Sequence, residues 1–464
     1  MQRRDWMKGT LLTAGATMGA VAGWPGLARA ASVERIGLLL PKSGQIYGRA
    51  AAALKAGIET AFRRLPKGFA IDIYETDESA KQLTAAYQGM LRRGTSLVIG
   101  PLTRNGTAAL ASFGEVPITT LALNQFEGDG SVPWNVLVFS IGVEQEAVQV
   151  ADMAFQAMRR KASNPKAPRA IIITAANQVG RRAASVFHGQ WQALGGEADL
   201  PIELEESALY KFREVAKKEQ GDLYFLSMAS HLARPVRMIT GRNQPAFGTS
   251  QISIGGPDAK TPIAELDGIR LVEMPAIIQP QSYGAQGFEA PPEDFSLEMQ
   301  RLYALGIDAL RIGREMFSGA TTLDLNGLTG KLRYDGSYPV IERTLLPAEY
   351  RNSVVQGDRR LAGGLGAVDL CHCVIPKILF TFANASSDRS ALAAGFGVGA
   401  TGCSGCGCGL GCTGATLPRP INLSWATAAA TAALTLLSKS AATASLMAFL
   451  SSPGLTAKRS KNCS

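Results

Sequence analysis

TSLVIGPLTRNGTAALASFGEVPITTLALN, residues 95–124, is the stretch of the sequence that decides the fold. Its first apolar run ends at Gly100 and Pro101, which is typical of a buried parallel strand followed by a sharp turn. Thr103 can then cap a helix, and a second, β-branched run ends at Asn124. Strand, turn, helix and strand in this order predict a βαβ unit, whose turns meet at the carboxyl ends of the strands.

The sequence on either side repeats the same alternation of short apolar runs and amphipathic stretches. A first series predicts further strands at 35–41, 70–75 and 136–141, with helices at 46–65 and 80–92. A second series predicts strands at 170–174, 200–204, 222–227 and 246–252, with helices at 144–161, 178–194, 210–219 and 231–240. Two such series indicate an α/β protein with two Rossmann-like lobes, each built on a parallel sheet, joined by a hinge.

Three later segments complete the predicted body. Residues 268–278 are expected to form a strand interrupted by Pro275, and residues 293–319 a long helix. Residues 327–334 and 340–346 are expected to form a hairpin. We assign the body to residues 31–356, with lobe 1 at about 33–143 and 276–325 and lobe 2 at about 144–275 and 326–356.

The first 30 residues have the features of a cleavable export signal. A basic start is followed by a modestly apolar stretch and by Ala28-Arg29-Ala30, which fits an A-x-A cleavage site. Arg3 and Arg4, before Trp6, Met7 and Lys8, are similar to the twin-arginine motif; the alternative is an ordinary secretory signal with a chance arginine pair. We therefore expect a periplasmic protein.

Residues 357–464 have a different composition and are not expected to form a folded domain. All seven cysteines lie after Leu370, and four of them occur in GCSGCGCGLGC at 402–412 without the paired spacing or the histidine of a metal site. The apolar run from Trp425 is interrupted by Lys439 and is too short to span a bilayer. We interpret the segment as a reading past the normal end of the gene; a disordered or membrane-associated tail is the alternative.

Charge and residue content exclude several classes of function for the body. The formal charge of +9 comes from the two ends, because residues 1–30 hold four basic side chains and one acid, and residues 371–464 hold seven and one. The body thus has no net charge, and it lacks the excess of basic residues that is typical of proteins that bind nucleic acid. It holds only His188 and His231, no G-x-S-x-G motif and no metal cluster, so we expect neither an enzyme nor a cofactor. The acids Asp77 and Glu78 follow a predicted strand and are expected to be solvated.

Nine segments in order along residues 35–350 resemble a known family. They are RIGLLLPKSG, AYQ at 86–88, LVIGPL, LALN, GRRAASVFHGQW, DLYFLSMASHLAR, LDGIRLVEMP, YALGIDALRI and LNGLTGKLRYD. In this number and order, the nine segments together resemble the penicillin-binding protein activator family, also called the LppC family. The resemblance implies a type I periplasmic binding protein fold. It also implies a role like that of the described members, which are outer-membrane lipoproteins that stimulate bifunctional peptidoglycan synthases without catalysis of their own.

The sequence departs from this pattern in two ways. We expect no lipid-carrying cysteine after the signal and no helical-repeat domain before the α/β body. The expected function is a non-enzymatic periplasmic protein that regulates peptidoglycan synthesis by contact with a bifunctional penicillin-binding protein. The alternative is the substrate-binding protein of an amino-acid-type ABC transporter, with a small amino-acid-like ligand.

The resemblance to solute-binding proteins also indicates which residues would line a ligand cleft. The positions after the strands of lobe 1 are Ser43, Thr103 and Asn124, and the lobe 2 positions that would face them are Gln178, Ser230 and Gln251. Thr103 could hold an anion with its hydroxyl and the amides of the helix start. These residue types are equally suited to capping helices and forming turns, and Gln251 stands where an acid would be expected to hold an ammonium group.

Overall fold

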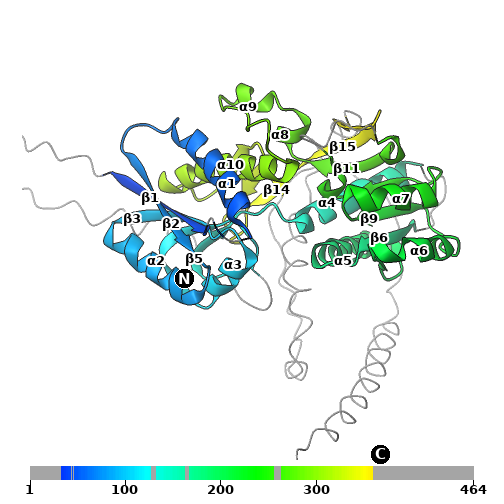
Figure 1. Cartoon of the computed structure of the whole chain (residues 1–464), viewed down its shortest axis with the longest axis horizontal. Coiled ribbons are helices and arrows are strands. Elements are labelled where there is room, and N and C mark those ends of the chain that lie inside the picture. The colour runs from blue at the N-terminus through cyan, green and yellow to red at the C-terminus, as the bar shows by residue number, and fades with distance from the viewer. Residues whose placement is uncertain are drawn as a thin grey trace, which may run out of the picture. The chain divides into compact units, whose positions relative to one another are not determined.

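The computed structural model describes residues 33–42, 44, 46–126, 132–161, 167–254 and 263–358. Within these residues the chain forms two lobes, each with a mostly parallel sheet between layers of helices (Figure 1). This architecture confirms the predicted α/β fold with two lobes. The predicted export signal lies outside the described residues, and so does the predicted tail beyond Asp358.

The first lobe contains a five-stranded parallel sheet with the order β2-β1-β3-β4-β5. Its strands are β1 (Glu34–Pro41), β2 (Phe69–Thr76), β3 (Thr95–Ile99), β4 (Glu115–Ala122) and β5 (Trp134–Val138). β1 lies between β2 and β3, so consecutive strands depart from it in opposite directions, as in doubly wound sheets.

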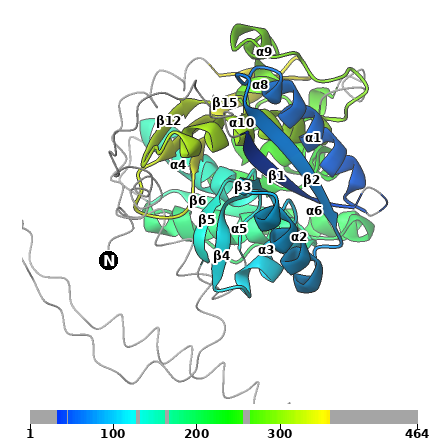
Figure 2. The same ribbon diagram turned by 90° about the vertical axis from the view of Figure 1, so that its left-hand side faces the viewer.

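Helices cover both faces of the first sheet. α1 (Gly48–Phe62) and α10 (Leu297–Phe317) pack on one face, while α2 (Ala80–Arg92) and α3 (Arg104–Ala111) pack on the other (Figure 2). The first face holds the larger apolar core, because α10 returns from the far end of the sequence to lie beside α1.

Two glycines allow α1 and α10 to pack backbone against backbone. A Cβ atom on Gly57 of α1 would lie 2.0 Å from the carbonyl oxygen of Tyr303, and one on Gly306 of α10 would lie 2.2 Å from that of Leu54. No side chain fits at either position without separating the helices.

The stretch at 95–124 folds as predicted into β3, a turn, α3 and β4. Gly100 in the turn has a φ of 115°, and a Cβ there would lie 2.1 Å from the carbonyl oxygen of Leu39 on β1. Only glycine suits this position, because the backbone conformation is left-handed and the neighbouring strand is too close. Thr103 is the N-cap of α3, as expected.

The second lobe contains an eight-stranded sheet. Its strands are β6 (Arg169–Ala175), β7 (Glu197–Ala198), β8 (Ile202–Leu204), β9 (Leu223–Ser227), β10 (Ala246–Gly248), β11 (Ile269–Glu273), β15 (Leu346–Arg351) and β16 (Val354–Gly357). The order is β16-β15-β11-β10-β9-β6-β7, with β8 also paired to β6. β15 and β16 are antiparallel additions to a sheet that is otherwise parallel.

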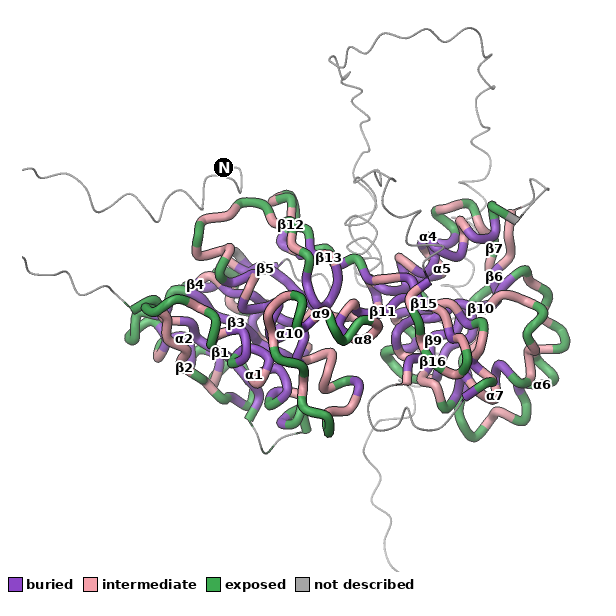
Figure 3. The backbone as a smooth tube through the Cα atoms, turned by 90° about the horizontal axis from the view of Figure 1, so that it is seen from above, coloured by how far each residue is buried: buried purple, intermediate pink, exposed green. Residues whose placement is uncertain are grey.

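Helices also cover both faces of the second sheet, and its inner strands β6, β9, β10 and β11 are buried between them (Figure 3). α4 (Val143–Lys161) and α5 (Gln178–Ala193) lie on one face, and α6 (Leu209–Ala216) and α7 (Ser230–Thr240) lie on the other. The predicted strand at 246–252 is too long, because the chain leaves β10 at Gly248 and forms the 3₁₀ turn η3 (Ser250–Ile252). Two further 3₁₀ turns among the described residues are η2 (Glu206–Ala208) and η5 (Ala264–Leu266).

Pro275 has a different role from the one predicted. β11 ends at Glu273, and Pro275 is the first residue of the short helix α8 (Pro275–Ile278), a position where proline is favourable because its missing N–H would have no partner. A second short helix, α9 (Ser282–Ala285), follows before α10.

A small antiparallel sheet belongs to the first lobe. It consists of β12 (Leu323–Asn326), β13 (Lys331–Tyr334) and β14 (Glu342–Thr344), and the pairing of β13 with β14 confirms the predicted hairpin. Its apolar residues Leu328, Leu332 and Ile341 join the core of the first lobe, whereas Leu345 joins that of the second. The predicted boundary at residue 326 is therefore too early, and the chain crosses between lobes near residue 345.

Candidate functional site at the lobe junction

Two of the predicted first-lobe residues, Thr103 and Asn124, lie just beyond the carboxyl ends of β3 and β4, where they hold the backbone of these loops. The Thr103 hydroxyl accepts a hydrogen bond from the Gly106 N–H at 3.2 Å and donates one to the Glu78 carboxylate. The Asn124 amide donates to the Leu102 carbonyl at 3.0 Å and accepts from the Gln125 N–H at 2.9 Å. Ser43 lies outside the described residues.

The predicted second-lobe residues lie at helix starts and in a turn. Gln178 is the first residue of α5, whose cap is Asn177, and Ser230 is the first residue of α7. The Gln251 side chain accepts a hydrogen bond at 3.3 Å from Thr249, two residues earlier. Capping and turn formation, the second interpretation of these residues, accounts for the contacts of Thr103 with Gly106 and of Gln251 with Thr249, whereas Asn124 also joins its loop to Leu102 on the neighbouring loop.

The structure reveals a charged bridge between the lobes that the sequence did not indicate. The Glu144 carboxylate, at the start of α4, accepts hydrogen bonds from Arg104 of α3 at 2.7 Å and from Arg182 of α5 at 2.8 Å. Glu144 is only 4% exposed, so this Arg–Glu–Arg bridge is largely shielded from water. One lobe supplies the first arginine and the other lobe supplies the second, so the bridge joins residues on both sides of the junction.

Glu78 is buried, contrary to the expectation that it is solvated. It is 6% exposed and has a φ of 61°, while its neighbour Asp77 is exposed. Burial raises the pKa of Glu78 above its usual range, although the hydrogen bond from Thr103 acts in the opposite direction. Its second carboxylate oxygen has no partner among the described residues. Adjacent acids can therefore differ in burial when a left-handed backbone turns one of them inward.

We expect Glu78→Gln to stabilise the protein at neutral pH. A carboxyl whose folded pKa is raised binds more protons in the folded state, so its presence makes stability fall as pH rises through that pKa. The glutamine can still accept the bond from Thr103 without a buried charge. Thermal unfolding between about pH 5 and pH 8 should show a higher melting temperature for the variant, with the gain largest at the upper end.

Asp77→Asn is the matched control, because hydrogen bonds from Ser79 lower the pKa of Asp77. Its stabilising contribution is present above the unfolded pKa, so this variant should be less stable or unchanged at neutral pH. Equal losses of stability in the two variants would contradict the assignment of Glu78 as a buried acid with a raised pKa.

A second charged cluster, which we call the hinge quartet, consists of Glu146, Glu273, Arg301 and Arg343. Arg301 of α10 contacts Glu273 at the end of β11 at 2.5 Å, and Arg343 of β14 contacts Glu146 of α4 at 3.4 Å. Both arginines thus belong to first-lobe elements and both acids to second-lobe elements. Glu146, Glu273 and Arg343 are each at most 2% exposed.

Backbone groups complete the hinge quartet. The Ser250 N–H donates to Glu146 at 2.9 Å, and the Ser250 carbonyl accepts from Arg301 at 2.8 Å, so the two ion pairs share this residue. Burial raises the pKa of Glu146, opposed by the nearby Arg343, and burial lowers the pKa of Arg343. With two charges of each sign, the quartet is neutral as a whole, which limits the cost of burying it.

Among the described residues, no group of three or more His, Cys, Asp or Glu side chains is arranged to hold a metal ion. In the same part of the chain, none of the helices has both the length and the apolar character needed to cross a membrane.

Comparison with known proteins places these features in a family. A family model described as "LppC putative lipoprotein" matches residues 28–208 and 210–353. The chain is 24% identical over 348 residues to the penicillin-binding protein activator LpoA of Photobacterium profundum, covering 68% of this chain and 55% of that protein. The chain is 26% identical over 352 residues to the LpoA of Haemophilus ducreyi, covering 70% of this chain and 54% of that protein. The chain thus spans about half the length of the curated relatives it matches.

Solved structures share the fold. The C-domain of Haemophilus influenzae LpoA, described as a regulator of PBP1A, matches with a TM-score of 0.55 at 17% identity, covering 70% of this chain and all of that one. A protein of Chromobacterium violaceum described as a putative branched-chain amino acid ABC transporter matches with a TM-score of 0.55 at 26% identity, covering 68% of this chain and all of that one. The fold is that of type I periplasmic binding proteins, as the sequence resemblance implied.

Proposed function

Because the chain belongs to the LppC family, we propose that it regulates a bifunctional peptidoglycan synthase in the cell envelope by direct contact. The curated relatives named penicillin-binding protein activators support the kind of partner. The partner would be a bifunctional penicillin-binding protein, and the protein would act on it without catalysis or a cofactor of its own. Nucleic acid is not a partner in this proposal.

The observation that carries the proposal is the charged bridge at the lobe junction. In a solute-binding protein, side chains at this junction contact water when the cleft is empty and must be free to contact the ligand when it binds. Here Glu144 already holds Arg104 and Arg182 with an internal carboxylate. Thr103 and Asn124 are hydrogen-bonded to Glu78 and Leu102 on neighbouring loops of the first lobe. A ligand would have to break these buried or partly buried contacts, which costs more than displacing water.

The proposed location is the periplasm. The twin-arginine-like start with Arg3 and Arg4 and the A-x-A site support export by a cleavable signal, and the family description as a lipoprotein supports a place in the envelope. Localisation of a fusion to a reporter that is active only outside the cytoplasm tests this part of the proposal, with Arg3 and Arg4 both replaced by lysine as the variant that should remain inside.

A second candidate is the substrate-binding protein of an amino-acid-type transporter. The observation in its favour is the fold shared with the Chromobacterium violaceum protein at 26% identity. In that case Ser43, Thr103, Asn124, Gln178, Ser230 and Gln251 would face a ligand, and substitution of Thr103 or Asn124 would abolish its binding.

One experiment separates the two candidates. We expect the full chain to raise the rate of glycan polymerisation by a bifunctional synthase from the same organism, and Asn124→Ala and Thr103→Ser to leave this stimulation unchanged. We also expect no amino acid to shift the melting temperature, although a ligand at a hundred times its dissociation constant would stabilise a binding protein by about 2.7 kcal/mol. An amino acid that raises the melting temperature of the native chain but not of Asn124→Ala would favour the transporter candidate.

A further inference from the structure

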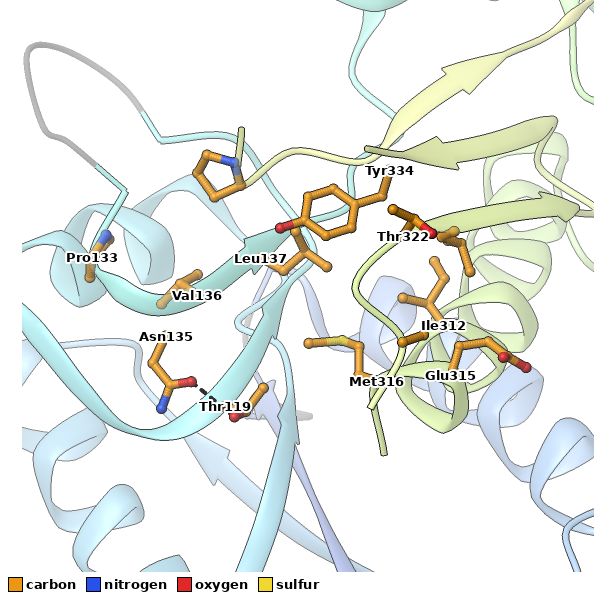
Figure 4. Close-up of a pocket in the computed structure, with 13 residues that line it drawn as sticks. Thr119, Pro133, Asn135, Val136, Leu137, Ile312, Glu315, Met316, Thr322 and Tyr334 are labelled. Atoms are coloured by element: carbon orange, nitrogen blue, oxygen red, sulfur yellow. Dashed lines mark hydrogen bonds between the residues drawn. The ribbon is translucent and has the colours of Figure 1, made fainter. Parts of the chain in front are cut away.

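The first lobe contains a pocket whose lining is mostly apolar and which neither candidate function uses. It has a volume of ≈ 80 Å³ and lies between β5, the carboxyl end of α10 and the small antiparallel sheet (Figure 4). Val136 and Leu137 line it from β5, Ile312 and Met316 from α10, and Tyr334 from β13.

The pocket is separate from the lobe junction. It includes Pro133 and Asn135, at the amino-terminal start of β5, and Thr119, in the middle of β4. The junction residues Thr103 and Asn124 follow the carboxyl ends of β3 and β4. A molecule in the pocket would therefore not compete with contacts at the junction.

The wall formed by the small sheet is fixed to α10 by a buried acid. Asp308 of α10 accepts hydrogen bonds from the Thr329 N–H at 2.8 Å, the Thr329 hydroxyl at 2.7 Å and the Leu328 N–H at 3.1 Å. These bonds hold the turn before β13 in place. The pocket is therefore formed in advance, which favours binding because little ordering is needed.

An extended peptide is a poor occupant, although β5 is the edge of its sheet. Val138 already uses that edge, because it donates to the Pro339 carbonyl at 2.8 Å and accepts from the Ile341 N–H at 2.8 Å. Asn135 has a φ of 72°, which interrupts the extended backbone that an added strand would need. The edge beside the pocket is thus too short and too irregular for strand addition.

We propose that this pocket binds a small, uncharged, largely apolar molecule, such as one substituted aromatic ring. The volume is about half of the ~150 Å³ of an apolar cavity that encloses benzene, so a ring would fill the pocket and extend past its exposed side. The Met316 thioether can make favourable contacts with ring edges, and Thr322, an exposed residue of the lining, can meet a polar substituent. Of the described residues that line the pocket, Glu315 is the one with a charge, so a carboxylate would be repelled. This inference is independent of the proposed synthase contact.

The test uses 4-methylphenol as the probe and 4-methylbenzoate as its charged counterpart. The full chain is labelled with ¹³C at its methionine methyl groups, and the Met316 resonance is assigned from the variant Met316→Leu. We expect the Met316 resonance to shift saturably with 4-methylphenol and at least tenfold less with 4-methylbenzoate at equal concentration.

Two neighbouring threonines supply a matched pair of variants. Thr321 and Thr322 are both exposed, but only Thr322 lines the pocket. Thr322→Trp should fill the entrance and weaken binding of 4-methylphenol at least tenfold, while Thr321→Trp should leave it unchanged. Ala320→Phe, at another lining residue, is the second blocking variant if Thr322→Trp does not fold.

Three results would overturn the proposal. The first is no saturable shift of the Met316 resonance up to millimolar 4-methylphenol, and the second is equal binding to Thr322→Trp and to the native chain. The third is a shift with a blocked tripeptide such as acetyl-Val-Phe-Val-amide but not with the phenol, which would assign the pocket to an extended peptide instead.

Discussion

Arg343→Met is expected to lower the free energy of unfolding by about 3–5 kcal/mol, because it leaves Glu146 as a buried charge without its nearest counter-ion. Arg343 is 2% exposed and donates to both Glu146 and the Thr329 carbonyl. Urea unfolding followed by circular dichroism measures the loss. Burial already raises the pKa of Glu146, so stability falls as pH rises, and the deficit of the variant should grow between about pH 5 and pH 8.

Two further variants test this explanation. Arg63→Met removes an exposed ion pair of 2.6 Å with Glu289 and should cost no more than about 1 kcal/mol. Adding Glu146→Leu to Arg343→Met removes the uncompensated charge, so part of the lost stability should return. If Arg343→Met cost as little as Arg63→Met, the hinge quartet would not be the stabilising contact that its burial indicates.

Gly306→Ala is expected to cost about 3 kcal/mol, at the upper end of the range for overpacked cores. The added methyl group would lie 2.2 Å from the carbonyl oxygen of Leu54, and backbone cannot move aside as a side chain can. The variant must separate α1 from α10, which opens the larger core of the first lobe. A melting temperature several degrees below that of the native chain is the expected measurement.

Gly284→Ala is the control for this prediction. Gly284 is a helical glycine of α9, and a Cβ there would meet nothing within 4 Å. Alanine should therefore change stability by no more than about 1 kcal/mol, and in the favourable direction, because alanine has the higher helix propensity. Similar melting temperatures for the two alanine variants would show that α1 and α10 can separate at little cost.

The fold was predictable from the sequence where the deciding signal is local. A turn and a helix start are marked by Gly100, Pro101 and Thr103. These signals depend only on the backbone conformation of the residues themselves and of their nearest neighbours. The structure confirms both roles. Pro275 shows the limit of such signals. Proline is compatible both with a strand edge and with the first residue of a helix, and only the tertiary structure selects the helix.

The candidate site was predictable only in part. Thr103 and Asn124 lie at the strand ends where the resemblance placed them, but their side chains bind Gly106 and Leu102 of the same lobe. The charged groups that join the lobes were not predicted, because their partners are distant in sequence; Arg343 and Glu146 are 197 residues apart. Glu144 and Glu146 at the start of a helix are compatible with a favourable interaction with the helix dipole, and nothing local indicates that both are buried.

The lobe boundary near residue 345 illustrates a related limit. The strands of the small sheet have apolar patterns that would suit either core, so the sequence cannot decide between them. Leu328, Leu332 and Ile341 join the first core because α10 provides Asp308 to hold the turn between β12 and β13. The pocket beside Tyr334 exists for the same reason, since the small sheet forms one of its walls.

The hinge quartet also determines how the body responds to mechanical load. Arg301 and Arg343 provide two side-chain links, and each runs from a first-lobe element to a second-lobe acid. A rotation of one lobe would have to lengthen both ion pairs. This is costly because the separated charges would stay buried, without water to replace their partners. We therefore expect a force applied to one lobe to be transmitted to the other with little bending between them.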